Sequence, residues 1–86
     1  MDNESVRAVL VQAVRRIRSD LAQAPISGDE HIAAELGLDS VDRMEMLIAV
    51  EEAFGIEEDV DPRIFMIPQT INDLAGRIVV TEASLT

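Results

Sequence analysis

The sequence of 86 residues contains no cysteine, tryptophan, tyrosine or lysine. Without cysteine there is no disulfide, no thiolate nucleophile and no sulfur ligand for a metal, so packing must stabilise the chain and any thiol chemistry must be supplied from outside. The acidic N-terminus has no basic stretch followed by an apolar run, so we expect neither a signal peptide nor a transmembrane segment. We expect one small domain over residues 1–86, soluble and cytoplasmic, and too short for a large enzyme.

Basic residues are scarce: seven arginines oppose 17 acidic residues, which gives a net charge of −10. Such a charge repels the phosphates of nucleic acids and anionic lipids, so we expect no nucleic-acid partner and no membrane insertion. The excess lies in residues 29–61, where twelve acidic residues accompany Arg43 alone. This segment is either a solvated face or a docking surface for basic proteins, and the apolar residues interleaved with the acids favour docking.

Apolar spacing predicts an all-α protein, a bundle of three long helices and one short helix. Apolar residues recur every three or four positions in helix I, over about 3–23. Helix II is predicted over about 40–54, with Asp39 as N-cap, Asp42 in the first turn and Gly55 as the stop. Its inward stripe is predicted to be Val41, Met44, Leu47, Ile48, Val50 and Phe54.

The second half of the chain carries two further helix starts. Asp61-Pro62 places an N-cap before a proline and predicts the short helix III over about 62–67. Thr70 and Asp73 predict the start of helix IV, over about 70–81, beyond which the chain is expected to fray. In the long connection before helix II, we expect Ile32, Leu36 and Leu38 to anchor the chain to the core.

Ser40 is a small hydroxyl at the predicted start of helix II. Taken alone, such a serine is usually a helix cap or has no special role. A phosphate attached there would lie close to unpaired backbone N–H groups at the positive end of the helix. The position therefore also suits a serine that carries a phosphate or a phosphodiester.

The residues around Ser40 form a longer pattern, Leu36-Gly37-Leu38-Asp39-Ser40-Val41-Asp42, Met44-Glu45-Met46-Leu47 and Glu51-Glu52-Ala53-Phe54-Gly55-Ile56. This pattern resembles the acyl carrier protein family. The similarity runs from helix I to Arg77-Ile78 and includes Asp61-Pro62 and the segment from Thr70 to Ala75. The sequence departs from the family's pattern at Val41, where leucine is common, and at Glu58-Asp59, where an apolar-proline pair is common.

The resemblance implies a carrier function. Ser40 matches the serine to which a phosphopantetheinyl transferase attaches phosphopantetheine from coenzyme A, which makes the protein a phosphoprotein, and Asp39 flanks that site. The terminal thiol of this arm carries an acyl group as a thioester. The residues that match the partner-docking helix are Val41, Asp42, Met44, Glu45, Ile48, Glu51 and Glu52.

The resemblance further implies a freestanding monomer that catalyses nothing itself. It would shuttle acyl intermediates of fatty-acid, polyketide or related specialised lipid biosynthesis between separate ligase, transferase or synthase enzymes with basic docking patches. Two alternatives stay open: an aminoacyl or peptidyl carrier of a nonribosomal pathway, and an acidic helical interaction module without the prosthetic group.

Other candidate chemistry is weak. Ser40 lacks the G-x-S-x-G motif of serine hydrolases, and the single histidine, His31, has no evident orienting partner. His31 and Glu35 lack further ligands for a metal, so we expect a solvent-facing histidine. The acids Glu57, Glu58, Asp59 and Asp61 lack the glycine and glutamate positions of an EF-hand.

Overall fold

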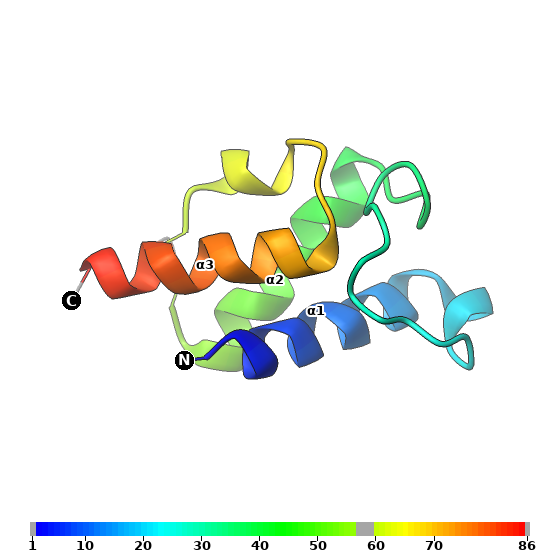
Figure 1. The fold of residues 1–86 in the computed structure, drawn as a ribbon, viewed down its shortest axis with the longest axis horizontal. Helices are drawn as coiled ribbons and strands as arrows, with labels where there is room; N and C mark the ends of the chain where they lie inside the picture. Colours follow the sequence, from blue (N-terminus) through cyan, green and yellow to red (C-terminus); the bar gives the residue numbers. More distant parts are fainter. Residues whose placement is uncertain (1, 57–59, 86) are drawn as a thin grey trace.

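The computed structural model describes residues 2–56 and 60–85, with side chains through residue 81. Its α-helices are α1 (Asn3–Ile17), α2 (Ser40–Phe54) and α3 (Ile71–Leu85). Two short 3-10 helices, η1 (Ser19–Leu21) and η2 (Pro62–Phe65), lie in the connections (Figure 1). In this described part no helix has the length and apolarity needed to cross a membrane. The all-α class is confirmed.

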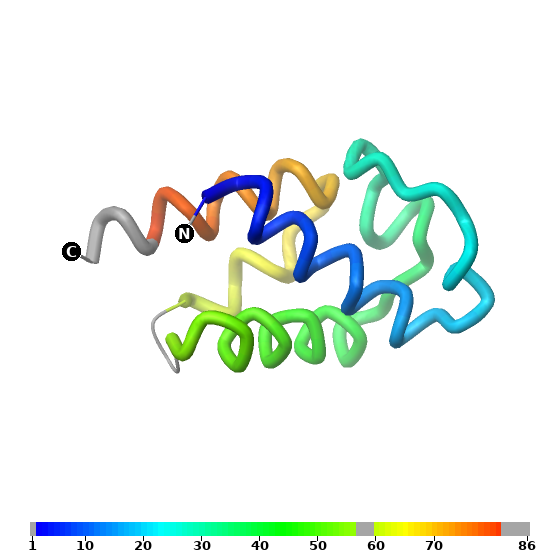
Figure 2. Tube along the Cα trace, turned by 90° about the horizontal axis from the view of Figure 1, so that it is seen from below, coloured from blue at the N-terminus to red at the C-terminus, as the bar shows by residue number. Residues whose placement is uncertain are grey.

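The helices are arranged around α1, which packs against both α2 and α3. Figure 2 shows α1 inclined to α2, with its N-terminal end beside α3 and its C-terminal end nearer to α2, and η2 links α2 to α3 through contacts with both. The long connection from α1 to α2 lies at one end of the molecule, beside the start of α3 (Figure 1). This arrangement leaves one face of α2 uncovered.

The core lies between these elements. Each α-helix contributes three or more buried apolar side chains, and the connections add the rest: Val6, Leu10, Ala13, Val14, Met46, Leu47, Val50, Ile71, Leu74, Ala75, Ile78, Ile32, Leu36, Leu38, Val60 and Phe65. The prediction that Ile32, Leu36 and Leu38 anchor the long connection is confirmed. Burying them offsets the entropy cost of ordering that connection.

The inward face of α2 differs from our prediction. Val41, Met44 and Ile48 were expected to point inward, but they are 66%, 37% and 49% exposed. Met46 takes the inward position instead, together with Leu47 and Val50. Because α2 carries apolar residues on two faces, helical spacing alone did not show which face packs against α1.

The first helix ends earlier than predicted, at Ile17 and not near residue 23. Arg18 leaves the helical conformation with φ −108° and ψ 84°. Its guanidinium donates to the carbonyl oxygen of Leu36 at 2.7 Å and pairs with Asp20 at 2.7 Å. The side chain of Arg15 then donates to two carbonyl oxygens in residues 22–24, so this segment satisfies them without an α-helix.

The predicted helix III is a 3-10 helix, so the four-helix count is not confirmed. Asp61 caps η2 and Pro62 begins it, as predicted, but η2 ends at Phe65 and not near 67. An α-helix would need the N–H of residue 68 to bond the carbonyl of Ile64, and Pro68 has no N–H. The side chain of Gln69 donates to that carbonyl instead.

The last helix begins as predicted and extends further. The hydroxyl of Thr70 accepts the N–H of Asp73 at 3.1 Å, and the Asp73 carboxylate accepts the N–H of Thr70 at 3.3 Å. α3 continues to Leu85, beyond the predicted end near 81. The sequence after Gly76 contains no glycine or proline that would end a helix, which explains why α3 continues past residue 81.

Candidate functional site: the start of α2

Ser40 is the first residue of α2, and its side chain is exposed. Asp39 is the N-cap: its carboxylate accepts the N–H of Asp42 at 2.8 Å, and the Asp42 carboxylate accepts the N–H of Asp39 at 3.2 Å. This capping box confirms the predicted helix start. The capping role therefore belongs to Asp39, and the Ser40 hydroxyl makes no hydrogen bond to any described residue.

The chain reaches Ser40 through a tight turn. Gly37 has φ +67°, a conformation that side-chain-bearing residues rarely adopt. The Leu38 N–H donates to the carbonyl of Ile32 at 3.1 Å. Arg18 binds the Leu36 carbonyl, and the hydrogen bond from Arg18 to Asp20 raises the pKa of Arg18 and lowers the pKa of Asp20. The turn before Ser40 is thus held by buried leucines and by an arginine from the end of α1.

The same connection is joined to the segment that leads into α3. The Ile32 N–H donates to the carbonyl of Gln69 at 3.0 Å, and His31 and Thr70 form an isolated β-bridge. The buried side chain of Gln69 also accepts a hydrogen bond from Arg77 on α3. His31 is exposed, as predicted. The position of Ser40 therefore depends on residues far along the chain.

The outward face of α2 combines apolar and acidic side chains. Val41, Met44 and Ile48 follow the i, i+3, i+7 spacing of one helix face, and all three are exposed. Of the acidic residues that we predicted to dock partners, Glu45 and Glu52 are exposed, whereas Asp42 and Glu51 are half-buried. The structure thus brings the predicted docking residues to the surface of the helix that begins at Ser40.

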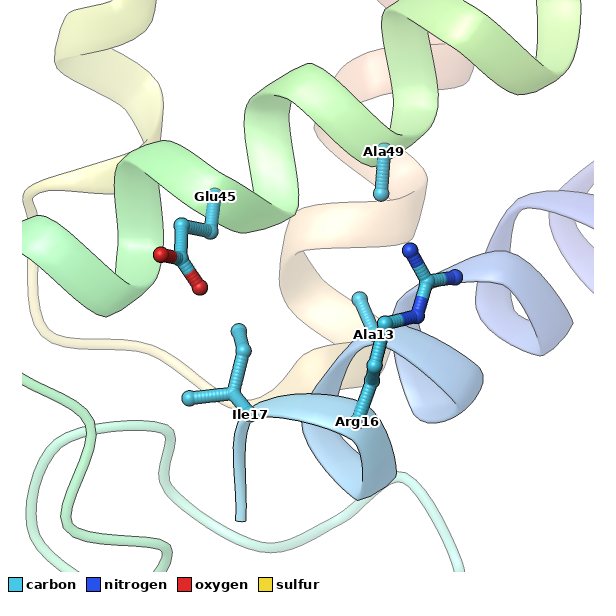
Figure 3. Close-up of a pocket in the computed structure, with 5 residues that line it drawn as sticks. All are labelled: Ala13, Arg16, Ile17, Glu45 and Ala49. Atoms are coloured by element: carbon cyan, nitrogen blue, oxygen red, sulfur yellow. The ribbon is translucent and has the colours of Figure 1, made fainter. Parts of the chain in front are cut away.

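A small hollow separates α2 from α1. Its lining is Ala13, Arg16, Ile17, Glu45 and Ala49, and its volume is about 70 Å³. Figure 3 shows Glu45 extending from α2 toward Ile17, while the guanidinium of Arg16 lies nearer to Ala49. Pockets that bind small molecules usually measure about 300–1,000 Å³. This hollow is too small for such a ligand.

The acidic segment provides no metal site in the part of the chain that the structure describes, since no three candidate ligands cluster there. Asp61 instead caps η2 and pairs with Arg63 at 2.6 Å, which lowers the pKa of Asp61. The predictions for Glu57, Glu58 and Asp59, including the departure from the family pattern at Glu58-Asp59, lie outside the described residues.

Arg43 is a site residue that sequence reasoning missed. Its Nε–H donates to the carbonyl of Asp39 at 3.3 Å, and an Nη1–H donates to the carbonyl of Met66 at 3.2 Å. Arg43 therefore joins the first turn of α2 to the residue that follows η2. Two features of the sequence could have identified Arg43. It is the one basic residue in the acidic segment 29–61, and it follows the predicted N-cap, Asp39, by four positions.

Comparisons with known proteins show which family this chain is similar to. Residues 8–78 match the family described as the phosphopantetheine attachment site, and Ser40 lies within that match. The mitochondrial acyl carrier protein of Saccharomyces cerevisiae is 32% identical over 78 residues, which cover 87% of this chain and 62% of that protein. The acyl carrier protein of Guillardia theta is 29% identical over 70 residues, 79% of this chain and 86% of that protein. No solved structure gave a significant match.

Proposed function

We propose a specific role for this chain, which belongs to the acyl carrier protein family. It carries acyl groups on a phosphopantetheine arm attached to Ser40. When bound, the arm supplies the thiol that this cysteine-free chain lacks, and with it the capacity to hold an acyl group as a thioester. The chain itself positions the arm and presents it to separate enzymes, with no catalytic activity of its own.

The observation that carries this proposal is the environment of Ser40. Its hydroxyl is exposed and uncommitted, because Asp39 caps the helix in its place. The backbone N–H groups of Ser40 and Val41 likewise make no hydrogen bond to any described residue. A phosphodiester on Ser40 would therefore lie beside free donors at the positive end of α2.

The outward face of α2 supports docking to enzymes with basic patches. Its acids attract arginine and lysine over a distance of about 8 Å in physiological salt, which speeds association. The exposed side chains of Val41, Met44 and Ile48 add apolar area that a partner can cover. Binding of this kind is fast, weak and sensitive to salt, as a shuttle between a phosphopantetheinyl transferase and acyl ligases, transferases or synthases requires.

The acidity around Ser40 favours an acyl cargo of fatty-acid, polyketide or related lipid biosynthesis over an aminoacyl cargo. Acylation of the modified protein by a fatty-acyl ligase, with no loading by amino-acid adenylation enzymes, is the expected result. The reverse pattern would support the aminoacyl carrier instead.

Intact-mass spectrometry tests the attachment. The protein is incubated with coenzyme A and a broad-specificity phosphopantetheinyl transferase, beside Ser40→Ala and the control Ser19→Ala, which removes an exposed serine at the start of η1. We expect the mass of one phosphopantetheine to be added to the wild type and to Ser19→Ala, and none to Ser40→Ala. A folded wild-type protein that gains no mass with several transferases would contradict the proposal and favour the acidic interaction module.

A further inference from the structure

We propose that Arg43 binds the phosphate of the arm and directs the arm to the η2 side of α2. The inference rests on the proposed function, since it concerns the phosphodiester that would join the arm to Ser40. It assigns a binding role to a side chain that the attachment reaction itself does not require.

The geometry places the guanidinium of Arg43 beside Ser40. The Asp39 carbonyl that accepts its Nε–H at 3.3 Å belongs to the peptide group whose nitrogen is that of Ser40. Ser40 and Arg43 are also three positions apart, so their side chains are neighbours on the helix surface. In a helix, side chains lean toward the N-terminus, and here that lean carries the guanidinium toward the start of α2.

Arg43 is also a cation without an acidic partner among the described residues. Arg18 pairs with Asp20, and Arg63 pairs with Asp61, but Arg43 binds only carbonyl oxygens. The nearest acids along the chain, Asp39 and Asp42, direct their carboxylates to backbone N–H groups in the capping box. Within the part of the chain that the structure describes, no ion pair therefore neutralises the positive charge of Arg43, although Arg43 lies in the most acidic part of the sequence.

The guanidinium retains donors for a phosphate. An arginine has five N–H groups, and the two described bonds use one on Nε and one on Nη1. The others remain available, and hydrogen bonds between a guanidinium and a phosphate oxygen are among the stronger ones in proteins. Because the bond to Met66 holds Arg43 toward η2, a phosphate that it binds is drawn to the same side.

Nitrogen and phosphorus NMR test this contact without an activity assay. The seven arginines give a small set of Nε–Hε signals, and the signal lost in Arg43→Gln assigns Arg43. We expect the Arg43 signal to shift between the unmodified and the modified wild-type protein. The signal of Arg16, an exposed arginine on α1 for which no ion pair is described, should stay in place.

The phosphorus signal of the modified protein gives the second measurement. We expect Arg43→Gln to move it toward the position seen in the urea-unfolded modified protein, and Arg16→Gln to leave it unchanged. An unmoved Arg43 signal in the wild type, or the same phosphorus signal in wild type and Arg43→Gln, would overturn the inference. If intact mass shows no modification at all, the proposed function itself has failed; modification without these shifts refutes only the role of Arg43.

Discussion

Replacement of Asp39 separates its capping role from its charge. In Asp39→Ala the N–H of Asp42 loses the carboxylate that accepts it at 2.8 Å, whereas the bond from the Asp39 N–H to the Asp42 carboxylate is retained. Because this position is exposed, a water molecule can accept part of the hydrogen bonding that the Asp42 N–H loses. We therefore expect the free energy of unfolding to fall by about 1 kcal/mol. In Asp39→Asn the side-chain oxygen still caps the helix, so we expect a change within about 0.5 kcal/mol.

Urea unfolding followed by far-ultraviolet circular dichroism is the suitable assay, because the chain has no tryptophan or tyrosine for intrinsic fluorescence. For a domain of this size, a loss of 1 kcal/mol corresponds to a decrease in Tm of about 4–8 °C. Glu52→Ala is the control, because it removes an exposed acid of α2 that does not cap the helix.

Two outcomes would refute the capping argument. If Asp39→Asn loses as much stability as Asp39→Ala, the charge of the carboxylate and not its hydrogen bond stabilises the helix start. If Asp39→Ala unfolds at the same urea concentration as the wild type, the capping box contributes nothing measurable.

Two further predictions concern α2 and the long connection. Leu47→Ala should lower the free energy of unfolding by about 2–5 kcal/mol, because Leu47 is buried. Ile48→Ala should lower it by less than about 1 kcal/mol, because Ile48 is half exposed. Equal losses in urea unfolding would contradict the assignment of Leu47 to the buried face of α2 and of Ile48 to the exposed face. The pKa of Glu30 is lowered chiefly by the backbone N–H of Ser27, so Glu30 stabilises the fold above its ordinary pKa and loses that contribution as the pH falls through the folded value. The stability difference between wild type and Glu30→Gln should therefore shrink between pH 6.5 and pH 3, while a difference that stays constant in urea titrations would disprove it.

The helix starts could be predicted because they depend on neighbouring residues. Asp39 with Asp42, Asp61 with Pro62 and Thr70 with Asp73 are local hydrogen-bond patterns. Gly55 ends α2 with φ +65°, as the sequence indicated. Such signals are complete within four or five residues and need no knowledge of the fold.

The remaining features depend on contacts between distant segments. The early end of α1 follows from the bond between Arg18 and Leu36, and the role of Arg43 depends on the carbonyl of Met66. The inward face of α2 is decided by the position of α1, since apolar residues lie on both sides of α2. Spacing along one helix contains no information about these partners.

The bonds between the long connection and the start of α3 join two segments that the ribosome makes at different times. Asn72 donates its backbone N–H to the carbonyl of Gly28 at 2.9 Å and its side chain to Asp29, 43 positions earlier. While a chain still emerging from the ribosome lacks residues 69–72, the turn before Ser40 is held only by the bond from Arg18 to Leu36 and by the buried leucines. The bonds that tie the long connection to the last helix are therefore completed only when that helix has begun to form, and a chain shortened from its C-terminal side would lose these bonds while it kept α2 and the capping box at Ser40.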